Sequence, residues 1–381
     1  MTPFANWSYP TAIRFGAGRI DELPAACAEA GMKRPLFVTD RGLAGLPIAE
    51  GALALLEGAG LGRAVFRDVD PNPTGANLAA GVAAYRAGGH DGVIAFGGGS
   101  ALDLGKAAAF MAGQTRPVWD FEDREDWWTR ADAAAIAPII AVPTTAGTGS
   151  EVGRASVITD EATAEKKIIF HPKFMPTVVI ADPELTVGMP RAITVGTGMD
   201  AFAHCLEAYC SPHYHPMSQG IALEGMRLVK QNLPVVHADP EDIEARAQMM
   251  AAAMMGAVAF QKGLGAIHAI SHPVGAIHHT HHGMTNAVVM GPVLAFNRPT
   301  IDARIAAAAA YLGIEGGFDG FAGFVADLKA ELDVPATLTD LGVTDPDLDR
   351  LTEAALKDPS CGGNPVALTR ENLRPLIEAC F

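Results

Sequence analysis

Cysteine is scarce in this 381-residue chain and follows no familiar pattern. The five cysteines are an odd number and include no Cys-x-x-Cys pair. The sequence therefore indicates neither a disulfide framework nor a zinc knuckle. We expect reduced thiols that are mostly buried, and a fold held together by its apolar cores.

Long hydrophobic runs and basic charge are also lacking. No run of about 18 apolar residues is present to span a bilayer, and residues 1–7 lack the basic and apolar regions of a secretory signal. We therefore expect a cytoplasmic protein. The 28 Lys and Arg residues against 43 Asp and Glu give a net charge of −15, which repels phosphate backbones and anionic membranes. Neither nucleic acid nor membrane is an expected partner.

The length and pattern of the chain predict two domains. A chain of 381 residues exceeds the roughly 250–300 that one core supports. Up to about residue 185, apolar β-branched runs alternate with alanine-rich stretches, as in a parallel sheet covered by helices. Beyond that point strand signals fade and helical patterns dominate. We expect an α/β domain over 1–185 and an all-helical domain over 186–381.

The α/β pattern is specific enough to place individual elements. An antiparallel hairpin, set into the sheet region, is expected from 154–159 and 167–170. The expected strands are 36–39, 64–66, 92–96, 139–142 and 177–181, and the expected crossover helices are 49–58 and 74–87.

Two clusters of metal-ligand residue types stand in the second half. Asp200 and His204 are four residues apart, as are His268 and His272, and His282 follows ten residues later. Residues four apart on a helix share a face. Three imidazoles and one carboxylate suit Fe(II), Zn(II), Mn(II), Co(II) or Ni(II) better than Mg(II) or Ca(II). The alternative is a solvated His-rich loop, because six of the twelve histidines lie between residues 268 and 282.

Two glycine- and threonine-containing turns follow predicted strands. Gly97-Gly98-Gly99-Ser100 joins the strand 92–96 to a helix, where backbone N–H groups and the helix amino terminus could hold a pyrophosphate. The alternatives are a tight turn and an ordinary cap at Ser100. The second turn, 143–151, follows strand 139–142, and ligands of open parallel sheets bind at these strand ends.

Asp40 directly follows the first strong strand, 36–39. A carboxylate there can accept both ribose hydroxyls of an adenosine and repel a 2′-phosphate, which favours NAD over NADP. The structural alternative is a turn-forming Asp before Gly42.

Over nearly its whole length, the chain resembles the iron-containing, or group III, alcohol dehydrogenases. That resemblance implies a Rossmann-like dinucleotide-binding domain followed by a helical metal- and substrate-binding domain, and a homodimer or larger assembly. It is carried by Asp70-Pro71-Asn72-Pro73-Thr74, Gly97 to Lys106, Thr144 to Glu151, Asp182-Pro183-Glu184-Leu185, Gly198 through Glu207, and His268 through Gly283.

The resemblance also implies roles for single residues. His272 corresponds to a histidine near the nicotinamide and substrate, outside the first metal shell, and the family's hairpin lysine falls on Lys166 or Lys167, of which we favour Lys166. The implied metal ligands are Asp200, His204, His268 and His282. The implied NAD contacts are Asp40, Asn72, Gly97, Gly98, Gly99, Ser100, Asp103, Thr144, Thr145, Thr148 and Ser150.

The expected activity is hydride transfer between an alcohol or aldehyde and NAD(H), with Fe²⁺ as the expected metal and Zn²⁺ as the alternative. His272 is the candidate for proton exchange, because an imidazole titrates near neutral pH; a pocket-lining role is its alternative. The competing functions are a same-fold lyase resembling dehydroquinate synthase, a metal-dependent hydrolase and a catalytically silent metal-binding protein. Extra histidines at 278, 279 and 281, where relatives commonly carry other residues, leave the substrate open.

Overall fold

The chain folds into two compact units in the computed structural model, which describes residues 5–7, 11–163 and 165–381. The first unit comprises Met1–Thr145 and Ser150–Gly188, and the second comprises Ala146–Gly149 and Met189–Phe381. This division falls within three residues of the boundary expected after residue 185. Part of the segment 1–7, on which the expectation of no secretory signal depends, lies outside the described residues.

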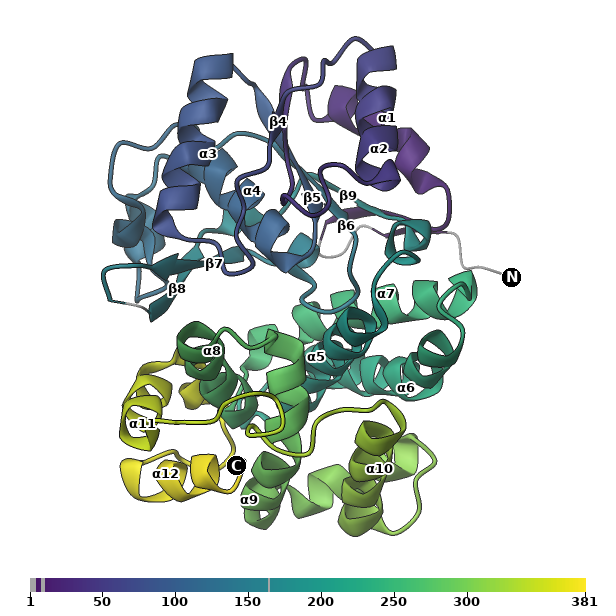
Figure 1. The fold of residues 1–381 in the computed structure, drawn as a ribbon, viewed down its shortest axis with the longest axis vertical. Coiled ribbons are helices and arrows are strands. Elements are labelled where there is room, and N and C mark those ends of the chain that lie inside the picture. Colours follow the sequence, from purple (N-terminus) through teal and green to yellow (C-terminus); the bar gives the residue numbers. More distant parts are fainter. Residues whose placement is uncertain (1–4, 8–10, 164) are drawn as a thin grey trace. The chain divides into compact units, whose positions relative to one another are not determined.

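The first unit is built on a seven-stranded sheet with the order β1-β2-β9-β6-β5-β3-β4 (Figure 1). Its neighbouring strands are parallel except for the antiparallel β1–β2 pair at one edge. The strands are β1 Ala5–Trp7, β2 Ala12–Phe15, β3 Pro35–Val38, β4 Val65–Phe66, β5 Gly92–Gly97, β6 Ile139–Pro143 and β9 Val178–Ala181. The helices are α1 Leu23–Glu29, α2 Pro47–Gly58, α3 Gly75–Gly88 and α4 Gly99–Met111.

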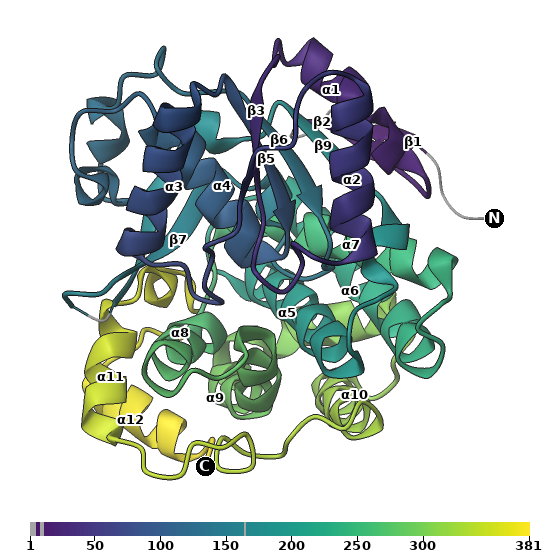
Figure 2. The same ribbon diagram turned by 45° about the horizontal axis from the view of Figure 1, so that its top comes forward.

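Helices cover both faces of this sheet, as Figure 2 shows. Adjacent strand residues alternate between two cores because successive side chains of a strand point to opposite faces. Val93 packs in the core formed with α3 and α4. Its neighbour Ile94 packs in the core formed with α1 and α2. The expected parallel sheet covered by helices is confirmed.

Two features of the first unit differ from the sequence expectation. Strands β7 Ala155–Asp160 and β8 Glu165–Phe170 form the expected antiparallel hairpin, but they make a separate two-stranded sheet. The edge strands β1 and β2 and the helix α1 were not expected. Each is seven residues or shorter, which is too short for a hydrophobic period to stand out.

The second unit contains helices and no strand among its described residues, in agreement with the all-helical expectation. Its central helix, α5, is buried at every position from Thr194 to Cys210 and packs against α6, α7 and α9. The helices are α5 Arg191–Cys210, α6 Pro216–Ala238, α7 Ile243–Ala259, α8 Ala266–His278, α9 His282–Tyr311, α10 Gly317–Glu331, α11 Leu348–Lys357 and α12 Arg370–Glu378. A 3-10 helix, η8, spans Pro359–Gly363.

Two cations, the buried Lys262 and the half-buried Arg304, hold the carboxyl end of α5. The Lys262 ammonium donates hydrogen bonds to the carbonyls of Ala208, Tyr209 and Ser211 at 2.7–3.0 Å. Arg304 Nη1 donates to the carbonyls of Tyr209, Cys210 and Ser211. Positive charge is favourable at this end of the helix dipole and satisfies carbonyls that the helix leaves unpaired. Both contacts fix the helix that carries Asp200 and His204.

Among the described residues, no single helix has both the length and the apolar composition to cross a bilayer. One pair, Ile243–Lys262 with Ala266–His278, passes these two criteria when taken together, and it is bent by 109°.

Candidate metal centre and cofactor turns

Three histidine side chains surround one carboxylate oxygen of Asp200, and the four residues come from three helices of the second unit. Asp200 and His204 lie one turn apart on α5, His268 lies on α8, and His282 is the first residue of α9. Asp200 Oδ1 lies 3.6 Å from His204 Nε2, 3.6 Å from His268 Nε2 and 3.5 Å from His282 Nε2. The first three residues are buried, whereas the His282 side chain is 27% exposed.

These spacings fit a divalent cation better than direct hydrogen bonds. They lie at or beyond the limit for a good hydrogen bond. Ligand atoms held about 2.1 Å from a tetrahedral metal are about 3.4 Å from one another. The ligand atoms of Asp200, His204 and His268 all lie within 4.8 Å of one another. The nitrogen and oxygen donors, without thiolate, fit Fe(II) or Zn(II).

A close contact between α9 and α5 places His282 next to Asp200. Gly283 on α9 faces Gly196 on α5, and a β-carbon built on Gly283 would lie 2.0 Å from the Gly196 carbonyl oxygen. Only glycine allows the two backbones to approach so closely. Gly196 lies one turn before Asp200, so this contact fixes the distance between ligands on different helices.

Glu207, two turns after Asp200 on α5, orients His268. Its Oε2 accepts a hydrogen bond from His268 Nδ1 at 2.6 Å, and its Oε1 accepts one from the Ile267 backbone N–H at 2.7 Å. A carboxylate only accepts hydrogen bonds. Nδ1 therefore carries a proton, and Nε2 is the ring nitrogen that faces Asp200.

Asn286, one turn after His282 on α9, also contacts the cluster. Its Nδ2 lies 2.8 Å from Asp200 Oδ1, 3.3 Å from His268 Nε2 and 3.2 Å from His282 Nε2. Its Oδ1 is buried and has no hydrogen-bond partner among the described residues. Sequence reasoning missed Asn286, although its spacing of four from His282 places both on one helix face.

Electrostatics favour the metal-binding protonation state at two of these residues. Burial raises the pKa of Asp200, but the histidines 204, 282 and 268 outweigh it and hold that pKa well below its usual range. Burial lowers the pKa of His204 to about 4. Burial also lowers the pKa of His268, but the nearby carboxylates of Asp200 and Glu207 outweigh it and raise that pKa to about 9. Metal binding at His268 therefore has to displace a proton.

His272 lies beside the four-residue cluster. Its ring stacks on His282, with centroids 5.2 Å apart and planes 15° apart. His272 Nδ1 lies 2.7 Å from Asp358 Oδ2. Sequence reasoning missed Asp358, which is 86 residues away and has no local spacing signal.

The two glycine- and threonine-containing turns follow neighbouring strands of the first unit. β5 ends at Gly97 and pairs with β6, which ends at Pro143. Gly97 has φ +142°, in the region that favours glycine, and its carbonyl accepts a hydrogen bond from the Thr144 N–H at 3.0 Å. A β-carbon built on Gly98 would lie 3.2 Å from Thr145 Cγ2. The two turns are therefore in contact, and Gly99 opens α4 beside them.

Asp40 contacts both its own turn and the glycine turn. Its Oδ1 accepts hydrogen bonds from the backbone N–H groups of Gly42 and Leu43 at 2.8 and 2.9 Å. Its Oδ2 lies 3.7 Å from the position of a β-carbon built on Gly97. The carboxylate thus shapes the turn through one oxygen and directs the other towards the glycine turn.

Three more of the predicted NAD contacts form bonds within the first unit. Ser100 is not the helix cap, because its Oγ donates to the Pro71 carbonyl at 2.5 Å, next to Asn72. Asp103 accepts hydrogen bonds from Ser150 Oγ at 2.5 Å and from the Val157 N–H at 2.9 Å. These bonds tie the turns to the hairpin. Thr148 belongs to Ala146–Gly149, which clusters with the second unit.

The two hairpin lysines differ in their surroundings. Lys167 Nζ lies 2.6 Å from Asp160 Oδ2, and it lies 5.1 Å from the ring centroid of Trp119. Lys166 is the adjacent residue on β8, so its side chain points to the opposite face of the hairpin.

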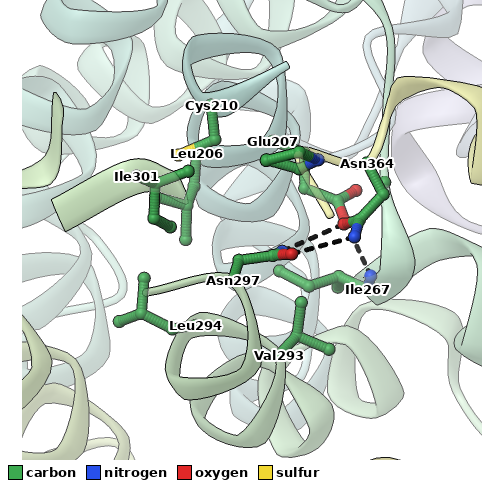
Figure 3. A pocket seen from close by; sticks show the side chains of 11 residues that line it. Leu206, Glu207, Cys210, Ile267, Val293, Leu294, Asn297, Ile301 and Asn364 are labelled. Carbon is green, nitrogen blue, oxygen red and sulfur yellow. Dashed lines mark hydrogen bonds between the residues drawn. The ribbon is translucent and has the colours of Figure 1, made fainter. Parts of the chain in front are cut away.

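A pocket lies within the second unit, next to Glu207 (Figure 3). Asn297 and Asn364, which line it, exchange side-chain hydrogen bonds at 2.9 and 2.8 Å, and Asn364 Oδ1 also accepts from the Ala266 N–H. Leu206 and Val293 give it apolar walls. The paired amides, and the Glu207 carboxylate bonded to α8, hold the helices around the four-residue cluster in place.

Comparison with known proteins identifies the family. A profile described as "Iron-containing alcohol dehydrogenase" matches residues 10–183, and its C-terminal counterpart matches residues 194–381. The 4-hydroxybutyrate dehydrogenase of Cupriavidus necator is 39% identical, over 97% of this chain and 98% of that protein.

Two solved structures share the fold over the full chain. A 1,3-propanediol oxidoreductase has a TM-score of 0.92 and 32% identity, with both chains fully covered. The sulfoacetaldehyde reductase of Bifidobacterium kashiwanohense, solved in complex with NAD⁺, has a TM-score of 0.86 and 31% identity, over 100% of this chain and 98% of that one. The resemblance seen in the sequence is confirmed, and this chain belongs to the iron-containing alcohol dehydrogenase family, whose members are NAD- and metal-dependent oxidoreductases.

Proposed function

We propose that this chain oxidises a short alcohol with NAD⁺, or reduces the matching aldehyde with NADH. The observation that carries the proposal is the convergence of His204, His268 and His282 on one oxygen of Asp200 at 3.5–3.6 Å. Family membership supplies the reaction class. These four residues would hold the cation, and Glu207 and Asn286 would orient them.

The bound cation would act as a Lewis acid that polarises the alcohol oxygen. The chain's part is to present neutral imidazoles and a carboxylate at fixed spacing. Asp200 is already ionised and His204 already neutral at neutral pH because of their shifted pKa values. These two residues would need no change of protonation on binding, as in a preorganised site, whereas His268 would have to lose a proton.

For the cofactor, we propose that the two turns of the first unit bind the pyrophosphate of NAD(H). The amino terminus of α4 adds its partial positive charge, and the free oxygen of Asp40 accepts the ribose hydroxyls and disfavours NADP. Lys166 remains the proposed cofactor lysine of the hairpin. The proposed contacts are Asp40, Asn72, Gly97, Gly98, Gly99, Ser100, Asp103, Thr144, Thr145, Thr148, Ser150 and Lys166.

The proposed proton acceptor is His272 Nε2. On oxidation, the carbon-bound hydrogen leaves with its electron pair as hydride to NAD⁺, and the hydroxyl proton passes to His272. The products are the aldehyde or ketone, NADH and one proton that the imidazolium returns to water. Among the residues that the structure describes, none is hydrogen-bonded to His272 Nε2, whereas its Nδ1 is engaged by Asp358.

The first substrate class to test is an ω-hydroxy acid or a diol. The relatives described above are named for 4-hydroxybutyrate and 1,3-propanediol, in which a second polar group lies a few carbons from the reacting one. We also propose a cytoplasmic homo-oligomer, to be tested by light scattering of purified protein.

The test is NADH formation with a panel of alcohols and diols, followed by absorbance, using protein reconstituted with Fe²⁺ or Zn²⁺. We expect turnover that depends on the metal and is fastest with a substrate carrying a second polar group. Binding of metal and NAD⁺ without turnover of any alcohol or aldehyde would contradict the proposed function.

A further inference from the structure

His272 and Asp358 form a hydrogen-bonded pair next to the four ligand residues. The atoms Nδ1 and Oδ2 are 2.7 Å apart, and the side chains are only 14% and 9% exposed. Asp358 lies at the junction of α11 and η8. The carboxyl-terminal part of the chain therefore supplies a carboxylate to a histidine on α8.

The two oxygens of the Asp358 carboxylate have different partners. Oδ1 accepts the backbone N–H of Ser360 at 2.8 Å, which caps η8, and Oδ2 faces His272. Burial raises the pKa of Asp358, but His272 and Ser360 outweigh it and lower that pKa to about 2. An ionised carboxylate accepts hydrogen bonds only, so His272 Nδ1 carries the proton and Nε2 has the lone pair.

Aromatic contacts with the ligand histidines fix the plane of the His272 ring. The ring stacks on His282 at a 15° angle, and it meets His268 edge-on, with centroids 5.7 Å and planes 69° apart. With Nδ1 anchored on Asp358, these contacts leave one orientation for Nε2. The tautomer and the direction of the lone pair are therefore both set before any substrate binds.

We propose that Asp358 is a positioning residue that locks His272 in the Nδ1–H tautomer and so presents Nε2 as the proton acceptor for the alcohol hydroxyl. This inference rests on the proposed function, in which His272 receives that proton. During oxidation the O–H bond breaks and an Nε2–H bond forms, while hydride passes to NAD⁺. Asp358 stabilises the resulting imidazolium, which then releases the Nε2 proton to water.

The test replaces Asp358 by Asn. Asp358→Asn keeps the side-chain oxygen that caps η8, but its amide N–H₂ would donate to Nδ1 and so favour the Nε2–H tautomer. We expect kcat to fall about 100-fold with KM changed less than about threefold. The matched control is Asp347→Asn, which alters a cap of the same kind at α11, where Asp347 Oδ1 accepts the Arg350 N–H. The control should keep the wild-type kcat.

A spectroscopic measurement reads the tautomer independently of turnover. In zinc-loaded protein labelled with ¹⁵N-histidine, long-range proton–nitrogen spectra distinguish protonated from unprotonated ring nitrogens. The His272 signals are assigned by their loss in His272→Ala. We expect a protonated Nδ1 in the wild type and in Asp347→Asn, and a protonated Nε2 in Asp358→Asn.

A double-mutant cycle separates this inference from the function on which it rests. In the His272→Ala background, Asp358→Asn should not lower kcat any further. If His272→Ala alone retains the wild-type kcat, the proposed role of His272 is wrong and the inference fails with it. If His272→Ala is slow but Asp358→Asn keeps the wild-type kcat and tautomer, only the role of Asp358 is wrong.

Discussion

Three carboxylate side chains in this protein each combine a structural contact with a functional one. Asp40, Glu207 and Asp358 each accept a backbone N–H with one carboxylate oxygen and direct the other towards a functional group. The backbone bond fixes the rotamer, so the second oxygen is held in place at little further entropic cost. Substitutions at these positions must therefore be chosen to keep the structural bond.

Asp40→Ser illustrates this choice. The serine hydroxyl can still accept from the Gly42 N–H, but it removes the charge that repels a 2′-phosphate. We expect the ratio of kcat/KM for NADP⁺ to that for NAD⁺ to rise about tenfold or more. Steady-state kinetics with both cofactors measure this ratio. An unchanged ratio would remove Asp40 from the ribose site.

The Asp358 carboxylate should also make the free energy of unfolding depend on pH in the acidic range. Its pKa is about 2 in the folded chain and about 3.9 when unfolded. Because the pKa is lower in the folded chain, the ionised carboxylate stabilises the fold at pH values above the unfolded-state pKa. This stabilisation is lost as the pH falls through the folded-state pKa. That contribution is about 2 kcal/mol. Urea unfolding of metal-free protein between pH 6 and pH 2 should show Asp358→Asn losing less stability than wild type; parallel curves would contradict this.

Sequence spacing predicts some of these residues and not others, for a physical reason. Asp200 with His204, and His268 with His272, lie about one helical turn apart, so a period of 3.6 places each pair together. Asp358 reaches His272 across 86 residues, and no local period encodes that contact. Glu207 and Asn286 also lie at helical spacing from the candidate ligands, but spacing alone does not show that they orient those ligands.

At the scale of elements, the site depends on how closely α9 approaches α5. Gly283→Ala would place a β-carbon 2.0 Å from the Gly196 carbonyl oxygen, which requires the helices to separate. We expect a loss of stability of about 2–4 kcal/mol and weaker metal retention. Thermal unfolding and metal analysis test both effects.

Gly291→Ala on the same helix is the matched control. Apart from its chain neighbours and its own helix backbone, a β-carbon at Gly291 meets no atom within 4 Å. Alanine is the better helix former but is disfavoured before Pro292, so stability should change by less than about 1 kcal/mol. If Gly283→Ala were as stable as Gly291→Ala, the close contact would not determine the position of His282.

The elements that the sequence predicts best are those with a clear hydrophobic pattern. The strands β3, β5, β6 and β9 are buried on both faces and read as continuous apolar runs. The hairpin β7–β8 shows alternation, but its pairing into a separate sheet is a tertiary outcome. The edge pair β1–β2 is too short to predict.

At the scale of the whole molecule, the proposed metal ligands lie in one unit and most proposed NAD contacts lie in the other. His268→Ala should therefore abolish metal retention and turnover, while the Kd for NAD⁺ stays within about threefold of wild type. Metal analysis and fluorescence titration with NADH measure the two properties separately. Loss of both in a folded variant would contradict this division of roles.

The central claim is that Asp200, His204, His268 and His282 together hold one cation that alcohol oxidation requires. The most direct measurement titrates metal-free protein with Zn²⁺ or Fe²⁺ while bound metal and NADH formation from an alcohol are followed together. We predict that activity rises in proportion to bound metal and saturates at one ion per chain, and that Asp200→Ala shows neither. Full turnover by the metal-free protein, or by Asp200→Ala without bound metal, would contradict the account.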